Sequence, residues 1–168
     1  MTAFATPASF RIDAAAPADC DDLVALIRGL AEYESLTHLL QVTPLALAEH
    51  LFGATPSAEA VIARDADGSA LGFALWFRNF STFLGKPGLY LEDIFVLPSA
   101  RGRGIGKALI RHVGAIAVER GCGRFEWSVL DWNTSAIGFY ESLGATVLPD
   151  WRIVRVTGEA LARFRREG

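Results

Sequence analysis

Apolar residues recur at helical spacing in several stretches of the chain. Within residues 20–34, Leu23, Ile27 and Leu30 fall on one face, and acidic residues at the start suit the positive end of a helix dipole. An apolar stripe over residues 105–120 predicts a second amphipathic helix. Further helices are predicted from Pro44 to near Gly53, behind a Thr-Pro start signal, and over residues 135–143.

Strands are predicted where short runs of branched and aromatic residues are bounded by glycine, proline or aspartate. Residues 58–64 and 70–78 flank an Asp-Ala-Asp-Gly turn and predict an antiparallel hairpin. The run YLEDIFVL at 90–97 predicts a strand rich in branched and aromatic residues. Other strands are predicted at 10–14, 125–130, 146–148 and 152–156. This order of elements predicts an α/β fold with a mixed sheet, and we expect one domain over residues 1–168.

Composition narrows the class of protein. The chain has 168 residues, of which 51% are apolar and 21% charged, with a formal net charge of −3. These values exclude a disordered chain and a general nucleic-acid binder. The N-terminal segment lacks the pattern of a secretory signal, and no apolar run has the length of a membrane helix. We therefore expect a cytoplasmic protein with no membrane or nucleic-acid partner.

The cysteines and histidines carry no ligand pattern. Cys20 and Cys122 lie far apart and form no CxxC pair, which excludes a disulfide framework. The histidines, His38, His50 and His112, share no metal-ligand spacing. We therefore expect no metal site.

A glycine-rich loop, RGRGIGK at residues 101–107, lies between a predicted strand and a predicted helix. Alternate glycines let the backbone turn tightly and approach a ligand, and the free N–H groups of a helix start favour an anion. Arg101, Arg103 and Lys107 add positive charge at the same place. A tight turn with solvated arginines is the alternative.

Spacing excludes two other phosphate loops. A Walker A loop requires glycine at position 101 and Ser or Thr at position 108, where this chain has Arg101 and Ala108. The dinucleotide fingerprint requires glycine at position 107, which is Lys107. An R-G-x-G-x-G loop remains.

This loop resembles the pyrophosphate loop of the GNAT superfamily of acetyl-CoA-dependent N-acetyltransferases. The segments LYLEDIFV (89–96), RGRGIGKALI (101–110) and DWNTSAIGFYESLGA (131–145) resemble three successive blocks of that superfamily. They are most similar to the diamine (spermidine/spermine) and thialysine acetyltransferases. The resemblance implies a mixed, mostly antiparallel central sheet, flanked by helices and splayed at the acetyl-CoA site. It also implies a homodimer.

The resemblance implies which residues hold acetyl-CoA. The backbone at Phe95 and Val96, near the end of the strand that precedes the glycine loop, would lie along the pantetheine arm. The loop would hold the pyrophosphate, and residues at the helix predicted over 135–143 would complete the site. The implied residues are Phe95, Val96, Arg101, Gly102, Arg103, Gly104, Ile105, Gly106, Lys107, Asn133, Ser135 and Tyr140. Asn133 and Ser135 also suit the capping of the helix that follows, which is a sufficient structural reason for them.

Two adjacent carboxylates interrupt the apolar strand at 90–97. Strand alternation sends Glu92 and Asp93 to opposite faces unless a bulge intervenes, and a carboxylate on the buried face is costly unless paired or functional. The resemblance implies that Glu92 is the general base, acting through water. Asp93 is interpreted as an amine-binding or supporting carboxylate. A salt bridge or a cap is the alternative for both.

Tyr140 is the candidate general acid. A phenol with a pKa of about 10 can protonate a thiolate whose pKa is about 8.5. The resemblance implies this role on the CoA sulfur, whereas a half-buried packing residue is the alternative.

Substrate residues are implied at both ends of the chain. Glu34 and Trp151 match family positions near the amine, although a buried strand tryptophan is an alternative for Trp151. Residues 79–84 lack the carboxylate with which diamine acetyltransferases grip a long polyamine. We therefore expect a short diamine or a lysine-like amino acid such as thialysine in place of spermidine or spermine.

The distribution of charge supports an enzyme with two substrates. Between Asp93 and Glu119 the chain has four basic residues and no acidic one, while the rest has 12 basic and 19 acidic residues. The first part suits CoA phosphates and the second a cationic amine. The leading hypothesis is direct acetyl transfer in a ternary complex. The alternatives are a protein or peptide N-acetyltransferase and a non-catalytic CoA-binding module.

Overall fold

The computed structural model describes residues 10–165 and divides the chain into two units after Ser128. Each unit is described by itself. Residues 1–9, on which the expectation of no secretory signal rests, lie outside the described residues. The expectation of one domain over 1–168 stays a prediction.

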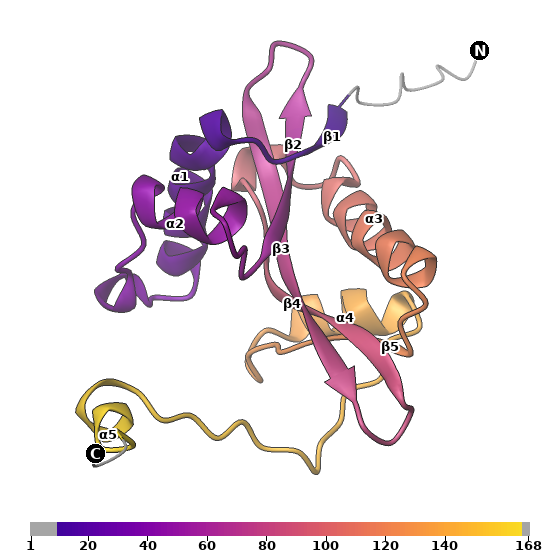
Figure 1. The fold of residues 1–168 in the computed structure, drawn as a ribbon. Coiled ribbons are helices and arrows are strands. Elements are labelled where there is room, and N and C mark those ends of the chain that lie inside the picture. Colours follow the sequence, from indigo (N-terminus) through magenta and orange to yellow (C-terminus); the bar gives the residue numbers. More distant parts are fainter. Residues whose placement is uncertain (1–9, 166–168) are drawn as a thin grey trace. The chain divides into compact units, whose positions relative to one another are not determined.

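The first unit is built on a five-stranded sheet with the strands in chain order (Figure 1). The first four strands pair antiparallel, and the last pairs parallel to its neighbour. This arrangement confirms the mixed, mostly antiparallel sheet. The strands are β1 (Phe10–Ala14), β2 (Glu59–Asp65), β3 (Ala70–Ser81), β4 (Lys86–Val96) and β5 (Arg124–Trp127).

Helices cover both faces of this sheet. Helices α1 (Cys20–Tyr33) and α2 (Pro44–Phe52) lie on one side and α3 (Ile105–Glu119) on the other (Figure 1). The predicted cap of α2 is present, because Thr43 Oγ1 accepts a hydrogen bond from the Ala46 N–H at 3.2 Å. Short 3₁₀ turns precede α1 (Pro17–Asp19), α2 (Thr37–Leu39) and the glycine loop (Pro98–Ala100).

The core under α1 and α2 takes alternate residues from three strands. Burial of these apolar side chains fixes the register of the sheet, since a slip of one residue would turn them to the other face. The buried members are Leu23, Val24, Leu26, Leu47, Leu51, Ala60, Ile62, Phe73, Leu75 and Phe95.

A β-bulge in β4 changes which residues face this core. Leu75 pairs with Asp93, but the next residue of β3, Trp76, pairs with Leu91, so Glu92 is the extra residue of the bulge. Because cross-strand partners share a face, Asp93 and Phe95 lie on the α1 face, whereas Leu91 lies on the opposite face. The bulge therefore places Asp93 on the α1 face of the sheet.

The second unit contains two helices, α4 (Thr134–Ser142) and α5 (Gly158–Ala162). Helix α4 confirms the helix predicted at 135–143, and α5 was not predicted. The strands predicted at 146–148 and 152–156 are wrong, because both segments are irregular in the described structure. Strand propensity alone does not hold a strand without a hydrogen-bonded neighbour.

The strand predicted at 125–130 is shorter than expected. It ends at Trp127, where its pairing with Leu91 of β4 also ends. Within residues 10–165, none of the helices has the length and apolarity needed to cross a membrane.

Candidate active site

The Asp93 carboxylate is half-buried in the face of the sheet that α1 covers. Its cross-strand partner, Leu75, belongs to the apolar core. Burial, followed by the nearby charges of Glu92 and Glu34, raises the pKa of Asp93 from 3.8 to about 6. A carboxylate with a pKa near neutrality is suited to accept and release a proton.

Three carboxylates predicted from the sequence therefore interact in the structure. Glu34 is the C-cap of α1 and is half-buried, and burial raises its pKa. Glu92, at the bulge, is exposed. The sequence identified all three residues but did not determine which was withdrawn from water. Together they form a site of negative charge that suits an ammonium group.

An open strand edge begins next to Asp93. Strand β5 pairs with β4 only as far as Leu91, so the β4 edge over residues 92–96 is not covered by β5. The predicted splay of the two strands stays a prediction, since β5 ends at Trp127. The Val96 carbonyl on this segment accepts a hydrogen bond from Arg101 Nε at 3.2 Å. Phe95 is buried and packs against Gly29 of α1, where a built Cβ would lie 2.9 Å from the ring.

The glycine loop follows this edge and begins with Arg101. Its guanidinium lies 4.9 Å from the centre of the Tyr33 ring and 5.8 Å from that of Phe95. Tyr33 is the last residue of α1, next to Glu34. Arg101 therefore connects the start of the loop with the end of the helix that bears part of the acidic site.

The loop presents the start of α3 in a form that suits an anion. Gly102 and Gly104 have φ values of +78° and +82°, which side chains with a Cβ rarely adopt. Gly104 is the N-cap of α3 and offers no side-chain cap, and the first turn has no acidic residue. The first N–H groups of the helix thus keep their capacity to bind an anion.

Gly106 has no packing reason to be glycine. Its φ is not in the left-handed region, and a built Cβ would meet only Val96 Cγ2 at 3.9 Å, an ordinary contact. Glycine inside a helix costs stability relative to alanine. A glycine at this position leaves the backbone open to close approach by a ligand.

The cations of the loop have different partners. Arg103 forms a bidentate ion pair with Asp65 at 3.0 and 3.1 Å, whereas Lys107 has no hydrogen bond or ion pair within the described part of the chain. Asp65 was missed by the sequence analysis, in which it was only part of a turn signal. Ile105, the first residue of α3, has a buried side chain.

The remaining predicted residues belong to the second unit. The Asn133 side chain caps α4 by accepting a hydrogen bond from the Ala136 N–H at 3.2 Å, and Ser135 lies in the first turn of that helix. Tyr140 is half-buried, with its ring 5.3 Å from that of Phe139. Trp151 is exposed in an irregular segment, so the alternative of a buried strand tryptophan is wrong.

Comparison with known proteins decides the family. The Acetyltransferase (GNAT) family profile matches residues 23–145, which include strands β2 to β5, the glycine loop and α4. The chain belongs to the GNAT family. Its enzyme class is accordingly that of an N-acetyltransferase with acetyl-CoA as donor.

The similarity to known GNAT proteins extends over nearly the whole length of this chain. A thialysine N-epsilon-acetyltransferase of Mus musculus is 38% identical over 164 residues, covering 92% of this chain and 96% of that protein. An L-ornithine N5-acetyltransferase of Arabidopsis thaliana is 35% identical, covering 90% of this chain and 86% of the plant protein. A solved integron cassette protein of V. cholerae has a TM-score of 0.76 at 30% identity, covering 92% of this chain and 96% of that one. The branch expected from the sequence is thereby confirmed.

Proposed function

We propose that this GNAT chain transfers the acetyl group of acetyl-CoA directly to the primary amine of a small diamine or lysine-like amino acid. The observation that carries the proposal is the half-buried Asp93, whose pKa is raised to about 6 and which belongs both to the acidic site and to the open edge of β4. An amine site and a donor site would thus meet at one short stretch of strand.

The residues of the donor side fit acetyl-CoA. The open β4 edge at Phe95 and Val96 suits the amide groups of an extended arm, and the uncapped start of α3 suits a pyrophosphate. Lys107, exposed in the first turn of α3, would face the phosphates. When bound, acetyl-CoA supplies the acetyl group as a thioester.

The acidic side would bind and deprotonate the acceptor. Glu34 and Glu92 would hold the ammonium form, whose pKa in an alkyl amine is about 10.4. Burial supports Asp93 as the group that takes the proton, whereas the family resemblance supports Glu92 acting through water. Tyr140 would hold the proton that the departing thiolate requires.

Two relatives bear on the acceptor. The names of the murine and plant relatives specify thialysine and L-ornithine, both amino acids with a second amine. Residues 79–84, at the tip of the β3–β4 hairpin, contain no carboxylate and expose Phe80, Phe83 and Leu84. These features favour a short acceptor over a long polyamine.

An amine screen tests the proposal. Acetyl-CoA is incubated with thialysine, ornithine, lysine, putrescine, spermidine and a peptide with a free N-terminus, and products are read by mass spectrometry. We expect the highest kcat/KM with a diamino acid or a short diamine. Faster acetylation of the peptide would favour a protein N-acetyltransferase, and CoA binding with no product would favour a non-catalytic module.

Matched variants assign the chemistry. Asp93→Asn, Glu92→Gln and Tyr140→Phe each remove one proton-transferring group with little change of shape. Loss of kcat by 10²-fold or more, an order-of-magnitude expectation for general acid–base catalysis, is expected for Asp93→Asn and Tyr140→Phe. Unchanged turnover in all three variants would overturn the assignments.

A cytoplasmic homodimer is also proposed, on family resemblance. Light scattering of the purified chain at several concentrations would measure its mass in solution. A monomer at every concentration that still acetylates amines would refute the dimer without affecting the proposed chemistry.

A further inference from the structure

Arg103 lies between two glycines, whose backbones can adopt conformations that other residues rarely reach. Gly102 and Gly104 both adopt left-handed φ values, and glycine reaches that region without steric cost. Within the described residues, one side-chain contact holds the segment 102–104 to the rest of the chain. Arg103 Nη1 and Nη2 donate hydrogen bonds to the two carboxylate oxygens of Asp65, at 3.0 and 3.1 Å. Two parallel hydrogen bonds fix orientation as well as distance.

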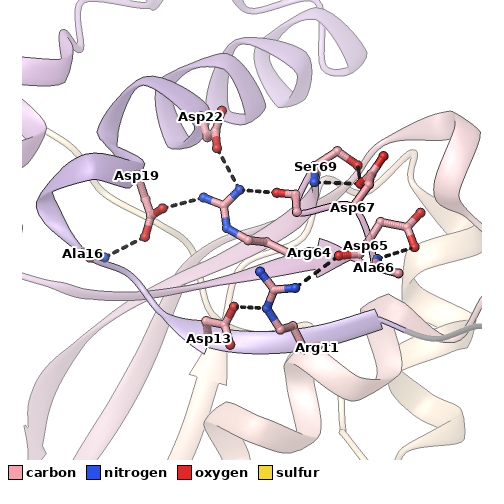
Figure 2. A network of polar contacts seen from close by, with 11 residues as sticks. Arg11, Asp13, Ala16, Asp19, Asp22, Arg64, Asp65, Ala66, Asp67 and Ser69 are labelled. Atoms are coloured by element: carbon pink, nitrogen blue, oxygen red, sulfur yellow. Dashed lines mark hydrogen bonds and ion pairs between the residues drawn. The ribbon is translucent and has the colours of Figure 1, made fainter.

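Asp65 is itself firmly held at the end of β2. It is paired with Phe10 of β1, and its N–H donates to the Ser69 carbonyl at 2.9 Å. Its carbonyl accepts a hydrogen bond from the Gly68 N–H at 3.0 Å. It also accepts one from Arg11 Nη1 at 3.3 Å (Figure 2). The Asp65 side chain also accepts from the Ala66 N–H at 2.9 Å.

The neighbouring residue Arg64 fixes the same turn to α1. It pairs with Asp19 and, at 2.9 Å, with Asp22, and it donates to the Gly68 carbonyl at 2.7 Å (Figure 2). The β2–β3 turn is therefore a rigid support, tied to the sheet by Asp65 and to a helix by Arg64.

We propose that Asp65 is a positioning residue for acetyl-CoA binding. By holding Arg103, it keeps the glycine loop in the conformation that presents the start of α3 to the pyrophosphate. This inference rests on the proposed use of that loop for acetyl-CoA. Asp65 acts through Arg103 and touches neither substrate.

The charges of the pair argue for this role over a direct phosphate contact. The guanidinium of Arg103 already faces a carboxylate, and the two charges nearly cancel at a distance. If the tether were absent, the loop would sample more conformations, and binding would have to order them. The tether thus lowers the entropy lost when the ligand binds.

The first test is titration calorimetry of the chain with CoA. We expect Asp65→Asn to weaken binding about 10-fold, an estimate for loss of loop preorganisation. Asp67→Asn is the matched control, because it removes the same charge from the same turn while Asp67 bonds only Ser69 among described residues. Equal or tighter CoA binding by Asp65→Asn would overturn the inference, and so would equal weakening in both variants.

A double-variant cycle separates positioning from direct contact. If Arg103 acts only through Asp65, Arg103→Gln should match Asp65→Asn, and the double variant should be no weaker than either. A larger loss in Arg103→Gln than in Asp65→Asn would instead make Arg103 a phosphate ligand and overturn the inference. If Asp65→Asn does not fold, Arg103→Lys keeps the charge but loses the bidentate geometry, and it should weaken CoA binding similarly.

A measurement of loop dynamics in the ligand-free chain completes the test. Amide hydrogen exchange over residues 102–106 should be faster in Asp65→Asn than in Asp67→Asn, and unchanged exchange would overturn the inference. Failure of the unmodified chain to bind CoA would overturn the proposed donor site together with the inference. Binding of CoA that Asp65→Asn does not weaken would overturn the inference alone.

Discussion

Asp93 on β4 lies directly opposite Leu75 on β3, so a carboxylate occupies a position on the sheet face that the apolar core under α1 otherwise fills. The bulge at Glu92 creates this relationship, because without it residue 93 would turn to the other face. Exposure of Asp93 to water is thereby reduced, and its pKa rises to about 6.

The dependence of activity on pH should report this carboxylate. Because Asp93 accepts a proton only when ionised, kcat/KM should fall as the pH drops through about 6. Steady-state rates between pH 5 and 9 would measure the profile, and Asp93→Asn should lose the limb near pH 6 while Glu92→Gln retains it. Loss of the limb in Glu92→Gln alone would instead identify Glu92 as the base.

Stability should change with pH in the opposite sense to activity. Since the pKa of Asp93 is higher in the folded chain than the usual 3.8, the folded state binds the proton more tightly. The contribution of Asp93 to the free energy of unfolding should therefore fall as the pH rises from about 4 to about 6. Urea denaturation at pH 4 and pH 7 should show that Asp93→Asn is more stable than the unmodified chain at pH 7, by at most about 3 kcal/mol. A destabilised Asp93→Asn at pH 7 would contradict this.

Gly106→Ala should separate binding from folding. The added methyl has room in the folded chain, and alanine favours a helix over glycine by up to about 1 kcal/mol. The melting temperature should stay the same or rise, whereas the KM for acetyl-CoA should increase about 10-fold or more because the methyl keeps the ligand from the backbone. An unchanged KM would mean that the ligand does not approach this residue closely.

Two strand glycines should differ in their effect on the donor site. A built Cβ would lie 2.5 Å from the Phe95 carbonyl oxygen at Gly72, and 2.4 Å from Asn79 Oδ1 at Gly88. Both Gly72→Ala and Gly88→Ala should destabilise the chain by about 1–3 kcal/mol, as overpacking does. Thermal unfolding would measure this loss. Only Gly72→Ala displaces the β4 edge at Phe95, so only it should raise the KM for acetyl-CoA.

The main elements of the first unit could be predicted from the sequence because each carries its own local signal. Leu23, Ile27 and Leu30 lie on the side of α1 that packs against the core, and Thr43 with Pro44 defines the start of α2. The glycine loop was recognisable because left-handed backbone at Gly102 and Gly104 requires that residue type. These features depend on neighbours in the chain.

The failed predictions concern pairing between distant segments. Residues 146–148 and 152–156 have strand propensity, but a strand forms only where a neighbour offers hydrogen bonds. The end of β5 at Trp127 has the same cause, because β4 stops pairing with it at Leu91.

The sequence by itself determined the α/β pattern, the anion-binding loop and the three acidic residues at 34, 92 and 93, since residue type and short-range spacing suffice for these. Only the tertiary structure decided that Asp93 is the most strongly buried of the three carboxylates and that Arg103 is held by Asp65, 38 residues away in the chain. A pKa depends on burial and nearby charge, and an ion pair on the approach of two elements. Both arise only once the sheet has brought distant segments together.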